Sequence, residues 1–185
     1  MIEAELKARV RDVGAVAWRL ARLAPGRGAV YRDTYYDTSD RALEARGAEL
    51  RVRTVGGDGG TRTVLTYKGA VVDEVSGSRP EHESGVADPD AVHAMLRGLG
   101  YGPVIAFEKH CRNHEFTARG RTMLATLVRV PELDGTFLEV EALVEPEELA
   151  DALADVRAVL ADLGIGEGDL TRELYTDAVR ARRDA

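Results

Sequence analysis

MIEAELKARV, residues 1–10, decides the fold because charged and apolar residues alternate strictly along it. Successive side chains of a β-strand point to opposite faces. One face of this strand would therefore be apolar, and the other would carry two carboxylates and an ammonium group, those of Glu3, Glu5 and Lys7. A solvated outer face is the ordinary explanation of such a pattern. Whether these charges face solvent or an interior site depends on the rest of the chain.

The composition fits a protein that folds around a hydrophobic core. Of its 185 residues, 44% are hydrophobic and 31% are charged, which suits one globular domain. The net charge of −7 supplies no overall basic field, so we expect neither nucleic acid nor a membrane as a partner. The single cysteine, Cys111, excludes an internal disulfide framework. Without a signal peptide or a long apolar run, the sequence predicts a cytoplasmic protein.

Most of the chain has strand character. Strands are predicted at about 2–10, 29–38, 48–55, 62–70, 71–84, 104–118, 121–130 and 135–144. The glycine-rich segment GGDGG, residues 56–60, reads as a hairpin loop. Helices are predicted at 12–23, 88–100, 145–164 and 169–183, with a short helical or turn segment at 39–47.

Charges with period two recur on strands that are far apart in the sequence. They occur at Glu3/Glu5/Lys7, Arg51/Arg53, Arg79/Glu81/Glu83 and Glu139/Glu141. About eight antiparallel strands can close into a barrel, in which each strand sends alternate residues inward. If the apolar faces pack against helices, the charged faces converge inside. The sequence therefore predicts an α+β fold: a closed, mostly antiparallel eight-stranded β-barrel with helices outside and a polar tunnel inside.

These motifs resemble the CYTH, or triphosphate tunnel metalloenzyme, superfamily, and the resemblance runs from Met1 to about Asp177. Its hallmark is an N-terminal ExExK, which here is residues 3–7. YRDTYYDT, LRVRT, LTYKG, SRPEHE, FEKHCR and FLEVE follow in that order. The superfamily includes class IV adenylyl cyclases, thiamine triphosphatases and inorganic triphosphatases. The resemblance implies a single CYTH-like domain over residues 1–185 and an eight-stranded triphosphate tunnel.

The resemblance also implies how the basic residues act. A triphosphate carries about four negative charges, and a dry tunnel can hold it only with several matching cations. The expected triphosphate ligands are Lys7, Arg51, Arg53, Lys68, Arg79, Lys109 and Arg112. Arginines can contact phosphate oxygens in a bidentate manner, whereas lysines act as compact point charges.

The carboxylates are expected to bind metal. Hard divalent ions such as Mg²⁺ or Mn²⁺ prefer oxygen ligands and bridge protein to phosphate. The expected metal ligands are Glu3, Glu5, Glu139 and Glu141. By family analogy, Glu81 and Glu83 support the site as ligands or by orienting the basic residues. Arg172 and Tyr175, in a C-terminal segment that can close one tunnel end in the family, are further candidates, with a helix-surface role as the alternative.

The expected chemistry is metal-assisted attack at phosphorus, with Lys7 and Glu5 as the catalytic candidates. In a hydrolase, water attacks the terminal phosphorus of inorganic triphosphate, thiamine triphosphate or a nucleoside triphosphate. In a class IV adenylyl cyclase, the ribose 3′-hydroxyl attacks the α-phosphorus of ATP and pyrophosphate leaves. A catalytically weakened binder of nucleotide or polyphosphate is the third alternative. A homodimer also stays open, because dimers occur in the family.

The sequence departs from the family pattern in two places. Many members carry an aspartate shortly before the ExE strand, where this chain has Val128, and Asp134 lies nearby in a turn. The Lys-x-Arg of the family is also stretched, since Lys109 is followed by Cys111 and then by Arg112. These departures concern the metal stoichiometry and the role of Arg112.

Several other polar residues have ordinary structural explanations. We expect surface or satisfied polar roles for the histidines and a core or wall position for Cys111. The tyrosines of YRDTYYDT fit the core or the barrel wall. Asp33 and Asp37, on the opposite parity to Tyr36, are candidates for a tunnel mouth.

Overall fold

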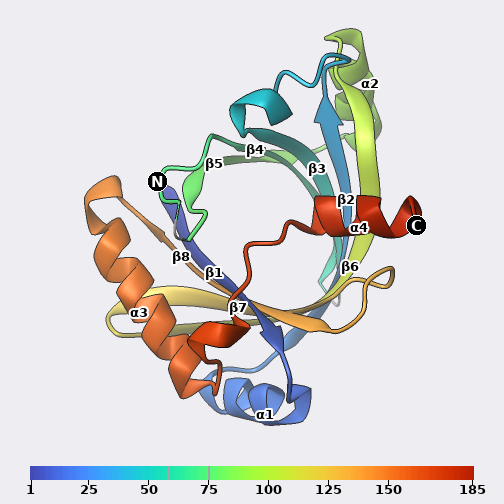
Figure 1. Ribbon diagram of the computed structural model, residues 1–185. Coiled ribbons are helices and arrows are strands. Elements are labelled where there is room, and N and C mark those ends of the chain that lie inside the picture. Colours follow the sequence, from blue (N-terminus) through green and yellow to red (C-terminus); the bar gives the residue numbers. More distant parts are fainter. Residues whose placement is uncertain (58, 75) are drawn as a thin grey trace.

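A computed structural model describes residues 1–57, 59–74 and 76–185. The described residues form eight antiparallel strands that close into a barrel in the order β1-β5-β4-β3-β2-β6-β7-β8 (Figure 1). The strands are β1 (Ile2–Val10), β2 (Arg27–Asp37), β3 (Glu49–Gly57), β4 (Gly60–Lys68), β5 (Arg79–Val86), β6 (Gly102–Ala118), β7 (Arg121–Arg129) and β8 (Thr136–Val144). The predicted α+β barrel is confirmed.

Four α-helices are present in the described part of the chain, outside the strands of the barrel. They are α1 (Val13–Leu23), α2 (Pro89–Gly98), α3 (Leu149–Asp162) and α4 (Tyr175–Arg183). Short 3-10 turns occur at Glu44–Arg46, Pro146–Glu148 and Glu167–Asp169. Asp12 and Asp88 cap α1 and α2 by accepting backbone N–H bonds, as their positions before the apolar repeats predict. None of the described helices is long and apolar enough to cross a bilayer.

The apolar face of β1 packs outward, under helices α1 and α3. Ala4, Leu6 and Ala8 belong to a buried cluster that also contains Val156 of α3 and Leu20 of α1. Figure 1 shows α3 lying along the outside of β1 and β8. Helices α1 and α3 therefore bury the apolar face of residues 2–10, and the charged face of this strand points into the lumen.

A second apolar cluster fills part of the lumen itself. Its buried members are Tyr35, Ile105, Phe107, Cys111, Val128, Val130, Phe137, Tyr175 and Val179, and we call it the apolar plug. The residues from β6 have the same parity as Lys109, which lines the central cavity. Helix α4 supplies Tyr175 and Val179, so the C-terminal helix packs against the lumen contents rather than against an outer face.

The barrel closes through a short seam between β1 and β5. These strands pair only at Ile2 with Pro80 and at Glu3 with Arg79. Further along β1, the C-terminal segment takes the place of a strand: Leu170 bridges Ala8, and the N–H of Thr171 donates to the carbonyl of Lys7 at 2.9 Å. The C-terminal segment therefore covers the free edge of the strand that carries ExExK.

Two predicted elements differ from the structure. Only residues 79–84 of the predicted strand 71–84 belong to β5, which continues to Val86, and Asp73 and Ser78 make an isolated bridge before it. The predicted helix 169–183 begins only at Tyr175, because the preceding residues pair with β1 in extended conformation. The hairpin at 56–60 is present through the pairing of Gly57 with Gly60, whereas Asp58 and Val75 lie outside the described residues.

Candidate active site

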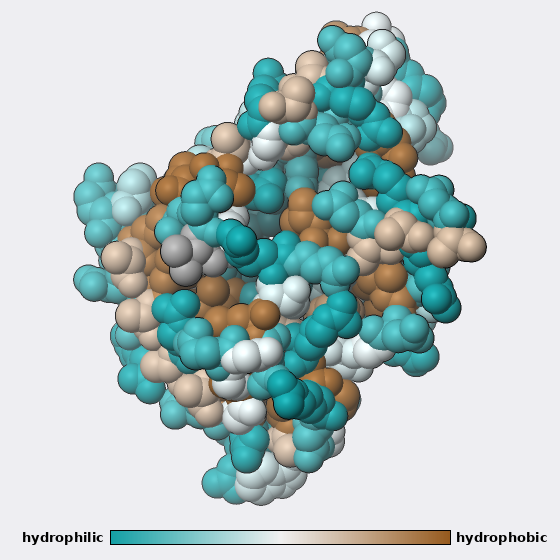
Figure 2. Space-filling model, in the orientation of Figure 1, coloured by the Kyte–Doolittle hydropathy of each residue, from teal (hydrophilic) through white to brown (hydrophobic). Residues whose placement is uncertain are grey.

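The barrel encloses a cavity of about 630 Å³ that is lined mainly by charged side chains. Hydrophilic residues surround much of the hollow on the face shown in Figure 2. All but one of the predicted site residues line this cavity, which we call the charged tunnel: Glu3, Glu5, Lys7, Arg51, Arg53, Lys68, Arg79, Glu81, Glu83, Lys109, Glu139, Glu141, Arg172 and Tyr175.

Arg112 is the residue that the structure does not bring to the tunnel. It is exposed on β6, and its parity is opposite to that of the tunnel-lining Lys109. Its guanidinium lies against Gly26, on the outer side of the barrel beside His114. The stretched spacing from Lys109 to Arg112 thus reverses the strand face.

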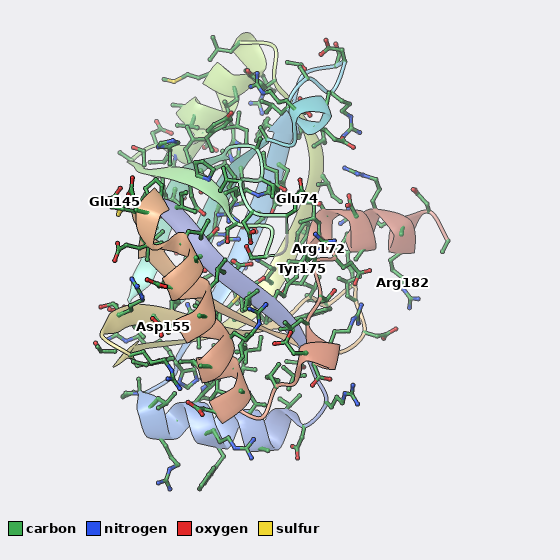
Figure 3. All side chains as sticks on the ribbon, turned by 60° about the vertical axis from the view of Figure 1, so that its left-hand side comes forward. Glu74, Glu145, Asp155, Arg172, Tyr175 and Arg182 are labelled. Carbon is green, nitrogen blue, oxygen red and sulfur yellow. The ribbon has the colours of Figure 1, made fainter. Side chains whose placement is uncertain are left out.

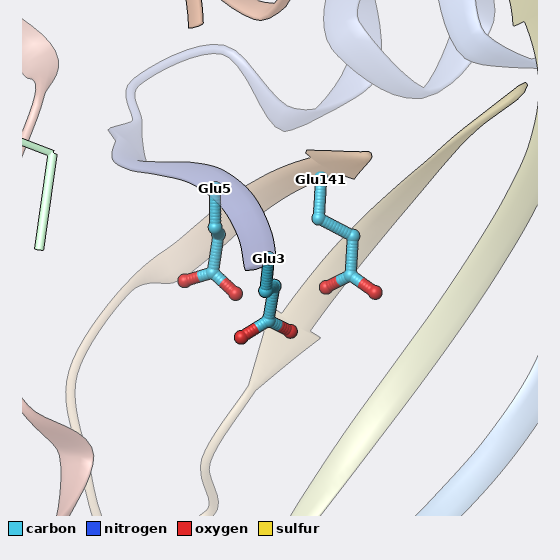
Figure 4. Close-up of side chains that lie close together, drawn as sticks. All are labelled: Glu3, Glu5 and Glu141. Carbon is cyan, nitrogen blue, oxygen red and sulfur yellow. The ribbon is translucent and has the colours of Figure 1, made fainter. Parts of the chain in front are cut away.

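Three carboxylates meet on the walls formed by β1 and β8 (Figure 4). Glu5 lies directly opposite Glu141 in the β1–β8 ladder, and Glu3 lies two residues earlier on the same face of β1. One oxygen from each of Glu3, Glu5 and Glu141 lies within 4.8 Å of the others. Like charges directly opposite each other on a sheet are destabilising, so this grouping needs a compensating cation.

Protonation behaviour reflects this crowding. Burial, together with the charges of Glu139 and Glu3, raises the pKa of Glu5 to about 7. Burial, together with the charges of Glu3 and Glu5, raises the pKa of Glu141 well above its ordinary value. A divalent cation would relieve both effects, and carboxylate oxygens are the ligands that Mg²⁺ and Mn²⁺ prefer. Glu3, Glu5 and Glu141 therefore fit a hard divalent metal.

Lys68 partly neutralises the acidic cluster. Its ammonium group lies 2.5 Å from a carboxylate oxygen of Glu3 and 2.9 Å from one of Glu81. Burial would lower the pKa of Lys68, but the nearby carboxylates, led by Glu3, raise it overall. Lys68 therefore stays charged at the boundary between the acidic and basic walls.

The basic wall is built around one buried aspartate. Asp33 accepts two hydrogen bonds from Arg53, at 2.6 Å from Nε and 2.7 Å from Nη2. Arg51 and Lys109 each place a nitrogen 4.0 Å from the same carboxylate. Burial would raise the pKa of Asp33, but Arg53, Lys109 and Arg51 lower it to about 2. Asp33 therefore holds three cations in place from beneath the tunnel lining.

These cations keep donors free for an anion. Arg51 donates from Nη2 to Thr66 at 3.3 Å, but its buried Nε has no hydrogen-bond partner among the described residues. Burial lowers the pKa of Lys109, and the neighbouring Arg53 adds to this effect. An orphaned buried donor and a destabilised ammonium would both gain from an anionic ligand.

Glu139 lies next to the three-carboxylate group, but it is paired with Lys7 in the β1–β8 ladder and its protonation is governed by the basic residues. Burial raises its pKa, but Lys109 and Lys7 outweigh this effect and leave the pKa lowered. The ring of Tyr175 lies between the two lysines, with its centroid 4.4 Å from Lys7 Nζ and 4.8 Å from Lys109 Nζ. Its hydroxyl interacts with Glu139 without reaching an ordinary hydrogen-bonding geometry.

The C-terminal segment crosses the mouth of the tunnel. Lys7 Nζ donates to the carbonyl of Glu173, and Arg172 donates to the carbonyl of Glu74 in the segment before β5. Figure 3 shows Arg172, Tyr175 and Glu74 gathered at the same region of the molecule. Arg172 and Tyr175 thus reach the tunnel from the extended segment and the first turn of α4.

The residues with ordinary structural explanations lie mostly where expected. The histidines line neither this cavity nor its neighbour in the described part of the chain. His114 and Cys111 are buried, and burial raises the pKa of the Cys111 thiol to about 12. Val128 is fully buried in the apolar plug, so the usual family aspartate position is occupied by packing. Asp37 accepts backbone N–H bonds from Leu43 and Glu44.

Sequence reasoning missed three tunnel residues that strand parity could have identified. Arg62 and Glu49 share the parity of Lys68 and Arg51 on their strands, and Thr126 shares that of Leu124. Asp33 was expected at a tunnel mouth, but it lies beneath the basic wall. The sequence does not distinguish a position at the tunnel mouth from one beneath the basic wall, because the side chain faces inward in both cases.

Chemically, the tunnel offers an oxygen-rich cation site beside a set of anion-binding nitrogens. Such a pairing suits a phosphorylated ligand that is shared between a hard metal and guanidinium or ammonium groups. The enclosed, charged walls also favour a compact polyanion over a protein or a lipid.

Comparison with known proteins agrees with this geometry. The sequence model of the CYTH domain family matches residues 1–175. The chain is 30% identical over 181 residues to adenylate cyclase CyaB of Aeromonas hydrophila, covering 96% of this chain and 86% of that protein. It is 26% identical over 180 residues to a Methanocaldococcus jannaschii protein provisionally named an adenylate cyclase, covering 96% and 98%.

A solved structure from Pyrococcus horikoshii superposes with a TM-score of 0.83 at 27% identity, covering 98% of this chain and 99% of that one. The whole barrel with its C-terminal segment is therefore shared with that protein.

Proposed function

This chain belongs to the CYTH family, and from that premise we propose that it is a divalent-metal-dependent enzyme that hydrolyses a triphosphate bound in the charged tunnel. The observation that carries the proposal is the lining of one cavity. Three carboxylates within 4.8 Å of one another lie in the same enclosure as Arg51, Arg53 and Lys109. A linear triphosphate with its metal is the ligand class that matches both walls.

Glu3, Glu5 and Glu141 would hold Mg²⁺ or Mn²⁺. When bound, the metal supplies charge neutralisation at the phosphate oxygens and lowers the pKa of a coordinated water. Glu139 lies opposite Lys7 and interacts with Lys109, so we assign it to positioning these two lysines. Glu81 and Glu83 support the site through Lys68 and Thr66 respectively.

The basic residues bind and align the phosphates. Arg53 is fixed by its bidentate bond to Asp33, so little side-chain entropy remains to be lost when phosphate binds. Arg51 and Lys109 add positive charge, and both lie beside the same buried carboxylate, that of Asp33. Lys68 and Arg79 extend the contacts toward the acidic wall, and Arg172 lies at the mouth.

In the proposed reaction, water attacks the terminal phosphorus, the bond to the bridging oxygen breaks, and orthophosphate leaves with a diphosphate product. Lys7 is positioned to orient the water or the terminal phosphate, because it lies one strand step beyond Glu5. Glu5 is the candidate to receive the water's proton. The charged walls disperse the negative charge that develops on the phosphoryl oxygens.

Cyclisation of ATP is the second candidate, and one observation favours it: the Aeromonas relative at 30% identity is named an adenylate cyclase. Cyclisation would use the same triphosphate contacts. It requires in addition that the ribose 3′-hydroxyl reach the α-phosphorus inside the tunnel.

Product analysis tests the proposal. The protein is incubated with ATP, thiamine triphosphate and inorganic triphosphate, each with Mg²⁺ or Mn²⁺, and products are separated by anion exchange and identified by mass spectrometry. Orthophosphate with a diphosphate product is the expected result. Formation of cyclic AMP and pyrophosphate would show that the protein is a cyclase and not a hydrolase. Binding without turnover would show that it is a triphosphate-binding protein.

A further inference from the structure

A second, smaller cavity opens beside the charged tunnel. It has a volume of about 200 Å³ and lies where β2 ends, β3 and β6 begin and α4 starts; we call it the side pocket. The two cavities share Tyr35, Glu49, Val71, Arg79, Leu174, Thr176 and Asp177. The two cavities are therefore adjacent, and these seven residues lie at their boundary.

The walls of the side pocket are apolar, in contrast to those of the tunnel. Leu50, Val104, Ile105 and Leu174 line it, together with the ring of Tyr35. That ring stacks on Phe107, with centroids 5.8 Å apart and planes inclined by 12°. The stacked pair gives the pocket a rigid aromatic side at its junction with the tunnel.

A β-bulge contributes to this wall. The β2–β6 register shifts between Tyr35, which pairs with Ile105, and Tyr36, which pairs with Pro103. Val104 has no partner in this ladder, and it packs with Ile105 against the same apolar cluster, although consecutive strand residues ordinarily face opposite sides. Bulges next to functional sites commonly redirect a side chain in this manner.

The charges at the rim of the side pocket are already paired. Arg41 contacts Glu44 at 2.9 Å, Arg79 contacts Glu49 at 3.2 Å, and Arg180 contacts Asp177 at 3.4 Å. The remaining rim carboxylate, Asp37, accepts backbone N–H bonds from residues 38, 43 and 44. Apart from Arg79, which also lines the tunnel, the described rim therefore offers no spare charge to a further phosphate or to a cationic ring.

We propose that the side pocket binds an uncharged, planar ring attached to the triphosphate, so that a nucleoside-type triphosphate is preferred as substrate over inorganic triphosphate. This inference rests on the proposed function, because it places the triphosphate in the charged tunnel. The pocket is below the volume of about 300 Å³ at which drug-sized ligand sites begin, so it suits one ring system such as a nucleobase. Apolar contact and stacking supply the affinity, and the paired rim charges exclude thiamine's cationic ring.

The test fills the side pocket without changing the tunnel. Val104 lines only the side pocket, so Val104→Trp places an indole where the ring would bind. Val13→Trp, on the exposed start of α1, is the matched control. KM for ATP and for inorganic triphosphate is measured in the wild type and both variants, with circular dichroism to verify folding and Val104→Phe as the replacement if Val104→Trp does not fold.

We expect Val104→Trp to raise KM for ATP by about tenfold, the loss that corresponds to about 1.4 kcal/mol of ring burial, and to leave KM for inorganic triphosphate unchanged. Equal changes for both compounds, or no change for either, would overturn the side-pocket proposal. If the wild type turns over neither compound, the proposed function has failed. In that case, equilibrium dialysis measures the affinities of the wild type and the same variants for ATP and for inorganic triphosphate. A loss of affinity for ATP alone in Val104→Trp would support the side-pocket proposal, and any other result would overturn it.

Discussion

The lumen of this barrel has two parts of opposite character, the charged tunnel and the apolar plug. Phe107 and Val128 in the plug are buried among apolar neighbours. Glu5 and Glu141, inside the same barrel, are buried among like charges that raise their pKa values. Packing in the plug stabilises the fold, whereas the tunnel keeps unfavourable charges in place for a ligand. The comparison teaches that stability and binding are separated within one lumen.

We expect the largest effect on stability from placing a charged carboxylate, like those of the charged tunnel, in the apolar plug. Val128→Asp would restore a carboxylate where many family members have one, but here the site is fully buried among apolar side chains. We expect a loss of about 4 kcal/mol in the free energy of unfolding, measured by urea denaturation, and no gain in turnover. Val128→Ala, which only opens a cavity, should lose about 2 kcal/mol. Increased turnover in Val128→Asp would mean that the plug is part of the catalytic site.

The reverse change removes a charge from the tunnel. Glu5→Gln should lower metal-dependent turnover at least about a hundredfold, because it removes a ligand for the ion that stabilises the transition-state charge. Glu115→Gln, at an exposed residue of β6 that does not line the tunnel, is the control and should retain full activity. Normal turnover in Glu5→Gln would exclude Glu5 from the metal site.

The same variant has an opposite effect on stability. The pKa of Glu5 is about 7 in the folded protein and 4.5 in the reference state, so its contribution to stability is present at low pH and is lost as the pH rises through 7. Metal-free Glu5→Gln should therefore melt at a higher temperature than the wild type at pH 8, and the difference should shrink at pH 4. A lower melting temperature at pH 8 would contradict the cost assigned to the acidic cluster.

Asp33 is the exception that joins the two parts, since it is a tunnel charge that stabilises the fold. Its pKa is about 2 in the folded protein against 3.8 in the reference state, so its stabilisation is complete above pH 3.8 and is lost as the pH falls toward 2. Urea denaturation between pH 5 and pH 2 should show about 2 kcal/mol more loss in the wild type than in Asp33→Asn. Parallel pH profiles would show that the Arg53 contact does not stabilise the fold.

The smallest expected effect compares two arginines on opposite faces of the barrel. Arg53→Ala should weaken triphosphate binding about tenfold, and more than monophosphate binding, because it removes a charge-assisted contact within the tunnel. Arg112→Ala changes an exposed residue on the outer side and should leave both affinities unchanged. Isothermal titration with both anions measures the difference. An equal loss in the two variants would remove the distinction between the inner and outer faces.

Strand parity accounts for most of what could be predicted about the site. It was sufficient for Glu3, Arg51 and Glu139, because regular alternation fixes the face of every second residue. The same rule could have added Arg62. The prediction for Arg112 relied on the spacing of the family motif and not on strand parity. The structure places Arg112 on the outer side of the barrel.

Contacts between distant segments account for what could not be predicted. The helix expected from residue 169 starts at Tyr175, since Thr171 donates to Lys7 in a strand far away in the sequence. The bulge that leaves Val104 without a ladder partner depends on the register between β2 and β6, which the sequence of either strand does not specify.

The sequence by itself determined the barrel and the inward direction of its charges, because alternation is a local property of each strand. Only the tertiary structure decided which charges meet. It grouped Glu3 and Glu5 with Glu141, assigned Glu139 to the lysines, and placed Asp33 beneath three cations. The physical reason is that Coulombic and hydrogen-bond energies depend on distances of a few ångströms, which are set by strand register, barrel closure and the path of the C-terminal segment.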